Sequence, residues 1–278
     1  MCSGGRAATV AASAEDLTQT VSSFCSCTTG RWSTGTAVLA LRPLSFGAPL
    51  QWLALGWQDF KRAPAIGLFY GASFMAMGWA LLGVFQHAPA YTLALSAGFL
   101  LMGPFMCLGL YDVSLQLERG LKPNLIDSMG AWASRTATLG IFGFVLLVLE
   151  MLWARASLIV FAVSFDGMPN FTLATLLDPE NISFFVVYLT VGGIFAGLIF
   201  AVSVVSIPMI LDRQTDAITA GLTSLRLCLT QPGLMIFWGA LITVLVVLAM
   251  APGFAGLMVV ALELGHASWH AYRAAVGT

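Results

Sequence analysis

Six long hydrophobic segments alternate with short polar stretches along the chain. They cover residues 65–85, 91–111, 136–153, 183–211, 234–250 and 253–266. Several of them exceed about 18 apolar residues, the length that a helix needs to cross a bilayer, and soluble cores rarely contain more than one such run. The pattern therefore predicts an all-α, polytopic membrane protein with about six transmembrane helices.

The segments that precede the first hydrophobic run have a different pattern. Residues 1–36 are rich in Ser, Thr, Ala and Gly without apolar periodicity, which predicts a disordered N-terminal arm that we extend to residue 47. Within 49–62, Leu50, Leu53 and Trp57 stand at helical spacing, which predicts a short amphipathic helix at the membrane surface. The integral membrane domain then covers 48–274, and 275–278 form a short cytosolic tail.

The number of crossings depends on residues 251–254, "APGF", which form either a turn between two spans or a kink in one long helix. If six helices cross and both termini face the cytosol, only Arg155 among the 12 basic residues lies outside. This distribution agrees with the rule that basic residues favour the cytosolic side. With five crossings, Arg273 would move to the outer side and the agreement would weaken.

Composition supports the membrane assignment and excludes several other classes. Hydrophobic residues make up 59% of the 278 positions and charged residues only 9%, whereas soluble domains contain about a quarter charged residues. A net charge of −1 provides no basic surface for nucleic acid. Five cysteines without a CxxC pair indicate neither a disulfide framework nor a zinc cage, and we expect no cofactor.

Three segments resemble one another: "RAPAIGLFYG" from Arg62, "RTATLGIFGF" from Arg135 and "LTQPGLMIFWG" from Leu229. They predict three helical hairpins, each preceded by an amphipathic helix on the cytosolic side. Such internal repeats are common in membrane transport folds.

A second alignment joins the ends of the returning helices: "DVSLQLER", "SIPMILDR" and "HASWHAYR". Each begins with a polar residue, seven positions before its arginine. Seven residues are nearly two helical turns, so the polar group shares a face with the arginine and lies about 10 Å deeper. The polar residues and their arginines are Asp112 with Arg119, Ser206 with Arg213 and His266 with Arg273.

Basic and aromatic residues at helix ends commonly reach the lipid headgroups. We therefore predict a set of membrane-interface anchors. They are Arg62, Arg119, Arg135, Arg213, Trp269, Tyr272 and Arg273.

His266 and His270 are four residues apart and share a helix face, a spacing that suits a transition metal if a third ligand comes from elsewhere. The third histidine, His87, belongs to the outer end of the first helix, about 30 Å away, which argues against a multi-histidine haem or copper site. The alternative is that both imidazoles join the interfacial belt with Trp269 and Tyr272.

Glu150 and Glu263 lie within hydrophobic segments, where a carboxylate costs a few kcal/mol and normally marks a buried partner or a water-lined path. Glu150 alternatively reaches the outer interface beside Trp153. Breaks and polar groups nearby extend the candidate substrate or ion path, although helix packing also explains them. The path residues are Glu150, Glu263, Pro104, Ser206 and Asp112.

Four ordered motifs in the chain resemble a known family. They are "GWQDFKRAPAIGLFYG", "GFLLMGPFMCLGLYDVS", "VVSIPMILDR" and "LGHASWHAYR". Together they resemble the bacterial predicted integral membrane proteins of domain-of-unknown-function family 2189, over about residues 48–274. The resemblance implies a bacterial inner-membrane protein with several helices, and it implies no activity. The chain departs from the family pattern after Ser114, where an arginine is absent, and before Leu264, where a proline is absent.

No Walker loop, GxSxG elbow, HExxH or Rossmann motif occurs, so we expect a protein that is not an enzyme. The favoured hypothesis is an accessory or scaffold subunit of the inner membrane that contacts lipid and a membrane-protein partner or a second copy. The alternative is a small-molecule or ion permease that uses Glu150 and Glu263. A metal- or haem-binding membrane subunit is the second alternative.

Overall fold

The structure is a computed structural model that describes residues 41–87, 92–164 and 182–277. All regular elements described in these ranges are helical. Four stretches among them are long and apolar enough to cross a membrane. They are α3 (Pro64–His87), α6 (Thr136–Ser164), the stretch Ile182–Arg213 made of α8 (Ile182–Ser203) and α9 (Ser206–Arg213), and α11 (Pro232–Met250). These findings confirm an all-α, polytopic membrane protein.

The other helices either precede a long helix or return from one. They are α2 (Ala48–Arg62), α4 (Thr92–Glu118), α5 (Leu125–Met129), η2 (Ala133–Arg135), α10 (Ala217–Thr230) and α12 (Leu257–Val276). Helix α4 covers the second hydrophobic segment. Helix α12 contains the sixth segment and the C-terminal motif, and it is more polar than the four candidate spans because it carries Glu263, two histidines and Arg273.

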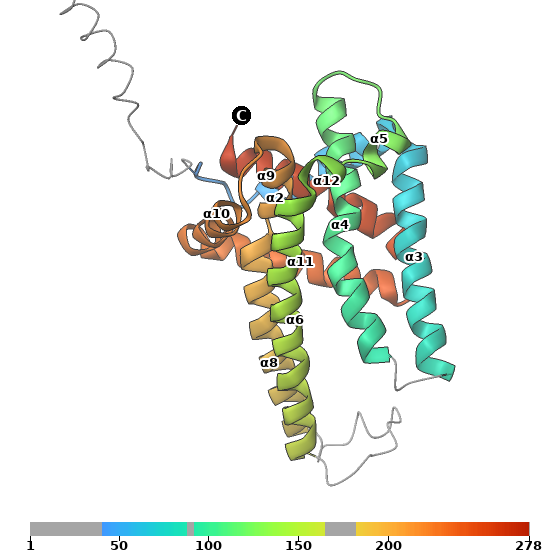
Figure 1. The fold of residues 1–278 in the computed structure, drawn as a ribbon, viewed down its shortest axis with the longest axis vertical. Helices are drawn as coiled ribbons and strands as arrows, with labels where there is room; N and C mark the ends of the chain where they lie inside the picture. Colours follow the sequence, from blue (N-terminus) through green and yellow to red (C-terminus); the bar gives the residue numbers. More distant parts are fainter. Residues whose placement is uncertain (1–40, 88–91, 165–181, 278) are drawn as a thin grey trace, which may run out of the picture. The chain divides into compact units, whose positions relative to one another are not determined.

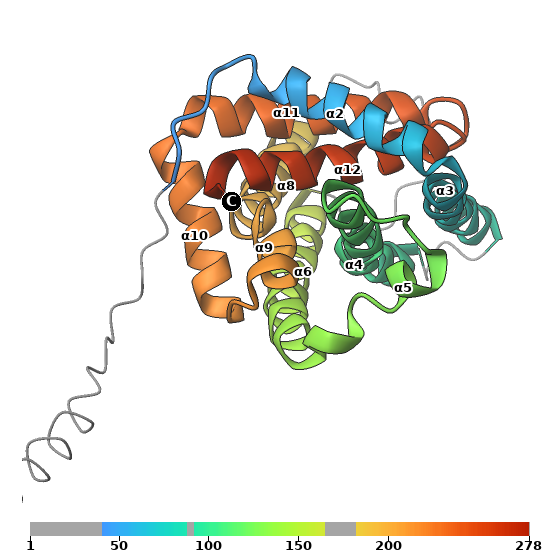
Figure 2. The ribbon, with the colours of Figure 1, turned by 90° about the horizontal axis from the view of Figure 1, so that it is seen from above.

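Two sets of helices run in different directions. Helices α3, α4, α6 and α8 are seen nearly end-on in Figure 2, whereas α2, α11 and α12 run across that view. Figure 1 shows α6 and α8 side by side over most of their length, and these two helices pack against each other. Helix α12 packs most extensively along α2 and also contacts α3 and α4.

A short helix precedes each of α3, α6 and α11, but the predicted repeat of three hairpins stays a prediction. The first and third breaks also share a geometry: Ala63 has φ −133° and ψ 58°, and Gln231 has φ −132° and ψ 57°. A proline follows at each break, as expected for the first residue of a helix. In space, however, α11 and α12 cross the other long helices and do not copy the pairing of α6 with α8.

The chain just before α2 is hydrogen-bonded to the rest of the membrane domain. Gln231 fixes the chain before α2, because its side-chain carbonyl accepts from the Leu44 amide at 2.9 Å and its Nε2 donates to the Arg42 carbonyl at 2.9 Å. The Arg42 amide donates to the carbonyl of Ala275 at 3.0 Å. Residues 42–44 are therefore ordered against the C-terminal helix, which continues to Val276. The rest of the predicted arm, residues 1–40, lies outside the described residues.

Residues 251–256 form a tight turn between α11 and α12, so "APGF" is a turn and not a kink in one long helix. That α12 forms a sixth span stays a prediction, because it is not among the candidate spans. Gly253 has φ 61° and Phe254 φ 67°, and such left-handed backbone reverses the chain within a few residues. The indole N–H of Trp79 in α3 donates to the Gly253 carbonyl at 2.8 Å. This bond holds the turn beside α3.

Candidate functional site

The C-terminal motif lies inside the protein. His266, Trp269 and Tyr272 are each 0% exposed, because α2, α4 and α9 pack around α12. The prediction that Trp269 and Tyr272 anchor the chain in the headgroups is therefore wrong. Both side chains combine an apolar ring with a polar group, which suggested an interface. Inside the protein these polar groups bind polar groups of neighbouring helices.

Arg273 joins α12 to two other helices. Its Nη2 donates to Glu118 Oε1 at 2.6 Å, and its Nη1 donates to Asp212 Oδ2 at 3.0 Å. The guanidinium also lies 5.5 Å from the ring centroid of Trp269, a cation–π distance. Since Glu118 ends α4 and Asp212 lies in α9, one cation connects three helices.

Arg213 likewise has partners within the protein. Its Nε donates to the hydroxyl of Tyr272 at 3.2 Å, and that hydroxyl donates to Asp212 at 2.7 Å. Its Nη2 donates to the backbone carbonyl of Gly277. Arg213 and Arg273 thus bind protein groups, although headgroup contacts were predicted for them. The other three predicted arginine anchors are exposed (Arg62 and Arg119) or half-buried (Arg135), and their contact with headgroups stays a prediction.

The two imidazoles have different partners. His266 Nδ1 is hydrogen-bonded to Ser114 Oγ at 2.8 Å, and His270 Nε2 to Asp59 Oδ2 at 2.8 Å. Within the described ranges no three His, Cys, Asp or Glu side chains gather closely enough to hold a metal ion. His87 lies at the end of α3, where its ring contacts the Gly83 carbonyl. The metal hypothesis for His266 and His270 therefore stays a prediction without a third ligand.

We call this set of side chains the C-terminal polar cluster. Its members are Asp59, Ser114, Glu118, Asp212, Arg213, His266, Trp269, His270, Tyr272 and Arg273. Burial raises the pKa of Asp59, but the hydrogen bond and charge of His270, together with the smaller effects of Ser114 and His266, outweigh burial and leave that pKa below its usual value of 3.8.

The Asp59–His270 pair gives a pH-dependent prediction. A carboxyl whose pKa is lowered on folding stabilises the fold above its unfolded pKa, and this contribution is lost as the pH falls through the folded pKa. We expect Asp59→Asn to lower the unfolding midpoint at neutral pH, and the difference from the wild type to shrink below about pH 4. Thermal unfolding in detergent across this pH range measures both. A difference that is constant down to pH 3 would contradict the assignment.

Glu150 lies in a second polar environment, between α4, α6 and α8. It is 7% exposed, and its Oε1 has no hydrogen-bond partner among the described residues. A cavity of about 340 Å³ opens beside it. The lining includes Pro104 of α4, Trp153 of α6, and Gly192 and Phe195 of α8. Burial supports the interpretation of Glu150 as an internal group and not as a residue of the outer interface.

The structure brings together only part of the predicted path. Glu150 and Pro104 line one cavity. Glu263 lies apart, on the face of α12 that packs against Gly56 of α2. Ser206 donates to the Val202 carbonyl, and Asp112 accepts from Gln116 at 2.6 Å; neither lines the cavity at Glu150.

Several residues of both sites were missed from the sequence. Asp59, Glu118 and Asp212 each lie in the last turn of a helix, and the signal that could have identified them is their rarity, because the whole chain contains 13 acidic residues. Ser114 carried no comparable signal. Its importance comes from the packing of α4 against α12.

Comparison with known proteins gives one match. No curated protein and no solved structure matches the chain. Residues 91–212 match the model of a family described as "Predicted integral membrane protein (DUF2189)". This stretch includes the "GFLLMGPFMCLGLYDVS" motif and all but the last residue of "VVSIPMILDR", whereas the other two motifs lie outside it. The resemblance is thus confirmed over this stretch: the chain is an integral membrane protein whose residues 91–212 match the DUF2189 family.

Proposed function

We propose that this protein is a permease that binds a small organic cation at Glu150 and catalyses no covalent reaction. One observation carries the proposal: a buried carboxylate with an unpartnered oxygen lines a cavity within the membrane helices. An intramembrane acid of this kind normally faces a partner ion or a substrate path.

The cavity lining favours an ammonium ion over a metal ion. Apart from Glu150 its side chains are apolar, and they include the rings of Trp153, Phe195 and Phe200. An inorganic cation that loses its bound water in the cavity needs several oxygen ligands from the protein. An alkylammonium ion needs one carboxylate and is attracted by aromatic faces within about 6 Å. The donor set therefore suits an amine-bearing molecule.

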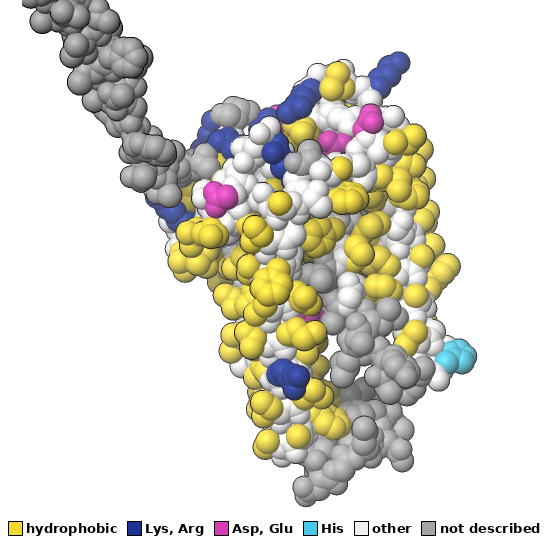
Figure 3. Space-filling view, in the orientation of Figure 1, with side chains coloured by type: hydrophobic (Ala, Val, Ile, Leu, Met, Phe, Trp, Pro, Cys, Tyr) yellow, Lys and Arg dark blue, Asp and Glu magenta, His cyan; other side chains and the backbone are white. Residues whose placement is uncertain are grey.

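The proposed location is the bacterial inner membrane, with both termini in the cytosol. On the face of the molecule that Figure 3 shows, the basic side chains lie mainly at one end of the helices. Arg155 lies 19 residues into α6 from Thr136, about 28 Å along the helix, and so near the opposite surface. The positive-inside rule assigns the richer end to the cytosol.

Uptake into proteoliposomes tests the proposal. We expect the wild-type protein to accumulate radiolabelled methylammonium faster than protein-free liposomes do. We expect Glu150→Gln to lower this rate at least about tenfold, since it removes the only charge among the described lining residues. Glu150→Asp, which keeps the charge on a shorter side chain, is expected to retain part of the uptake.

Glu263→Gln is the matched control. It removes a half-buried carboxylate from α12, away from the cavity, and is expected to leave uptake unchanged. Wild-type uptake in Glu150→Gln, or equal loss in both variants, would contradict a site confined to the Glu150 cavity.

The buried serine and histidine support a function without covalent catalysis. Ser114 Oγ and His266 Nδ1 form a pair of the kind used by nucleophilic enzymes. However, Ser114 is 1% and His266 0% exposed, and neither lines a described cavity. A substrate could not reach this hydroxyl without moving α2 or α12.

An accessory role in a larger assembly is a second proposal, supported by exposed apolar side chains on α6 and α8. Phe144 is 65% and Leu189 69% exposed, so these faces have room for lipid or for another membrane protein. Affinity purification in a mild detergent followed by mass spectrometry distinguishes the roles. A stable partner supports the accessory role, and a monomer supports an independent permease.

A further inference from the structure

A second cavity, separate from Glu150, lies between α3, α4, α5 and the start of α6. Its volume is about 520 Å³, within the range of about 300–1,000 Å³ that is usual for small-molecule sites. The rings and thioethers of Phe69, Met102, Phe105 and Met106 form much of its wall. Because Phe69 and Met102 are 39% and 50% exposed, the cavity is open to the surrounding hydrocarbon.

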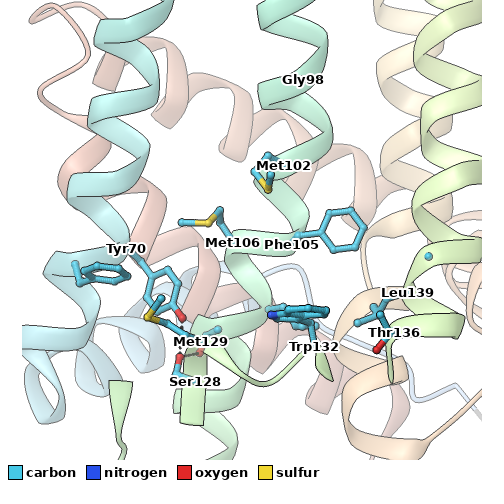
Figure 4. A pocket seen from close by; sticks show the side chains of 14 residues that line it. Tyr70, Gly98, Met102, Phe105, Met106, Ser128, Met129, Trp132, Thr136 and Leu139 are labelled. Carbon is cyan, nitrogen blue, oxygen red and sulfur yellow. Dashed lines mark hydrogen bonds between the residues drawn. The ribbon is translucent and has the colours of Figure 1, made fainter. Parts of the chain in front are cut away.

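The cavity has a polar end and an apolar end. Figure 4 shows Tyr70, Ser128, Trp132 and Thr136 near one end, with Met102 farther along α4. Ser128 Oγ donates to the Gly109 carbonyl and is bonded to the Tyr70 hydroxyl, both at 2.8 Å. These hydroxyls are satisfied within the protein. The indole N–H of Trp132, which is 53% exposed, has no hydrogen bond to any described residue and is available to a ligand.

A basic residue directly precedes one that lines the polar end. Arg135 stands in the short helix η2 directly before Thr136, which lines the cavity. Its Nε is buried and has no hydrogen-bond partner among the described residues, and no ion pair involves its guanidinium there. A half-buried guanidinium without a protein anion favours an anionic group of a ligand.

The length of the cavity matches one leaflet. Its α4 wall runs from Gly98 to Gly109, which is 11 residues or about 16 Å along the helix. Half of a hydrocarbon core of about 30 Å is about 15 Å. An acyl chain that starts at the polar end can therefore follow α4 to the middle of the bilayer.

From this geometry we infer a binding site for one anionic phospholipid of the surrounding leaflet. One acyl chain occupies the cavity along α4, and the phosphate lies at Arg135 and Trp132. The residues that recognise the lipid are distinct from those of the proposed permease site.

At two glycines that line the cavity, the first atom of a side chain meets no protein atom. A Cβ on Gly98 or on Gly140 would meet nothing within 4 Å, and both residues line the cavity from facing helices. Gly140→Leu and Gly98→Leu are each expected to exclude the acyl chain. Gly193→Leu is the matched control, because its Cβ position on α8 is equally open but lines neither described cavity.

The test uses the full-length protein in nanodiscs of equal parts phosphatidylcholine and phosphatidylglycerol, with retained lipids counted by native mass spectrometry after detergent transfer. We expect the wild type and Gly193→Leu to keep one phosphatidylglycerol, and both cavity-filling variants to lose it. Arg135→Gln is expected to lower the preference for phosphatidylglycerol over phosphatidylcholine about fivefold, and Arg226→Gln, an exposed arginine of α10, to leave it unchanged.

Retention of the lipid by both Gly140→Leu and Gly98→Leu would overturn the site. Equal retention of the two lipids by the wild type would overturn the anionic assignment. The outcome is independent of the permease proposal, since Glu150→Gln is expected to keep the bound lipid and Arg135→Gln is expected to keep methylammonium uptake.

Discussion

Replacing Gly71 by alanine is expected to separate α3 from α12 and to destabilise the protein by about 3 kcal/mol. A Cβ at this position would lie 2.0 Å from the carbonyl oxygen of Met258 and 2.9 Å from its carbonyl carbon. Both are backbone atoms, so no side-chain rotation can relieve the overlap. The helices must move apart, and Leu262, which packs on the same glycine, loses contacts. Thermal unfolding of the purified protein in detergent measures the effect.

Gly83→Ala in the same helix provides the control. A Cβ at Gly83 would meet nothing within 4 Å, so only the intrinsic helix preference changes. Alanine is preferred to glycine within a helix by about 1 kcal/mol. We therefore expect Gly83→Ala to match or exceed the stability of the wild type. Equal stability of both variants would show that α3 and α12 do not approach as closely as Gly71 requires.

The positions of the long helices could be predicted from hydrophobicity alone. Helix α11 (Pro232–Met250) agrees closely with the hydrophobic segment 234–250, because a single apolar run ends at a proline on one side and a turn on the other. Helix α6 continues about 11 residues beyond the predicted 136–153, to Ser164. The prediction stopped just before Arg155, but one exposed arginine does not end a helix.

The environment of α12 could not be predicted in the same way. Polar and aromatic residues at a helix end are equally compatible with headgroups and with a buried network. The difference depends on whether other helices supply acids and small residues opposite them. Here α2 supplies Asp59 and Gly56, where a Cβ would lie 2.8 Å from the Ala267 amide nitrogen. Such pairings join residues more than 200 positions apart, and a single sequence does not contain this information.

The candidate sites could likewise be predicted only in part. Glu150 was identified from the sequence because a carboxylate within an apolar run is conspicuous. Its cavity was not, since Trp153 and Gly192 become neighbours only when α6 packs against α8. The predicted path grouped Glu150 with Glu263 because both are acids within hydrophobic segments. Because α12 runs across the direction of α6 and α8, the two acids face different surroundings.

Arg273→Met is expected to destabilise the protein by about 2 kcal/mol, because it leaves Glu118 and Asp212 close together without the cation they share. Breaking a fully buried pair costs about 3–5 kcal/mol, and we reduce this figure because the Arg273 side chain is 21% and that of Glu118 39% exposed. Arg273→Lys should lose less, since it keeps the charge but cannot donate to both carboxylates in the same geometry.

If charge is the cause, removing the two acids should restore stability. Adding Glu118→Gln and Asp212→Asn to Arg273→Met eliminates the repulsion and is expected to recover at least half of the loss. Arg226→Met on α10 removes an exposed arginine without a described partner and should stay within about 0.5 kcal/mol of the wild type. Unfolding midpoints of Arg273→Met, Arg273→Lys, the triple variant and Arg226→Met, measured in one detergent, show whether charge causes the loss. A triple variant as unstable as Arg273→Met would instead assign the loss to the packing of the arginine on Trp269, 5.5 Å from its ring.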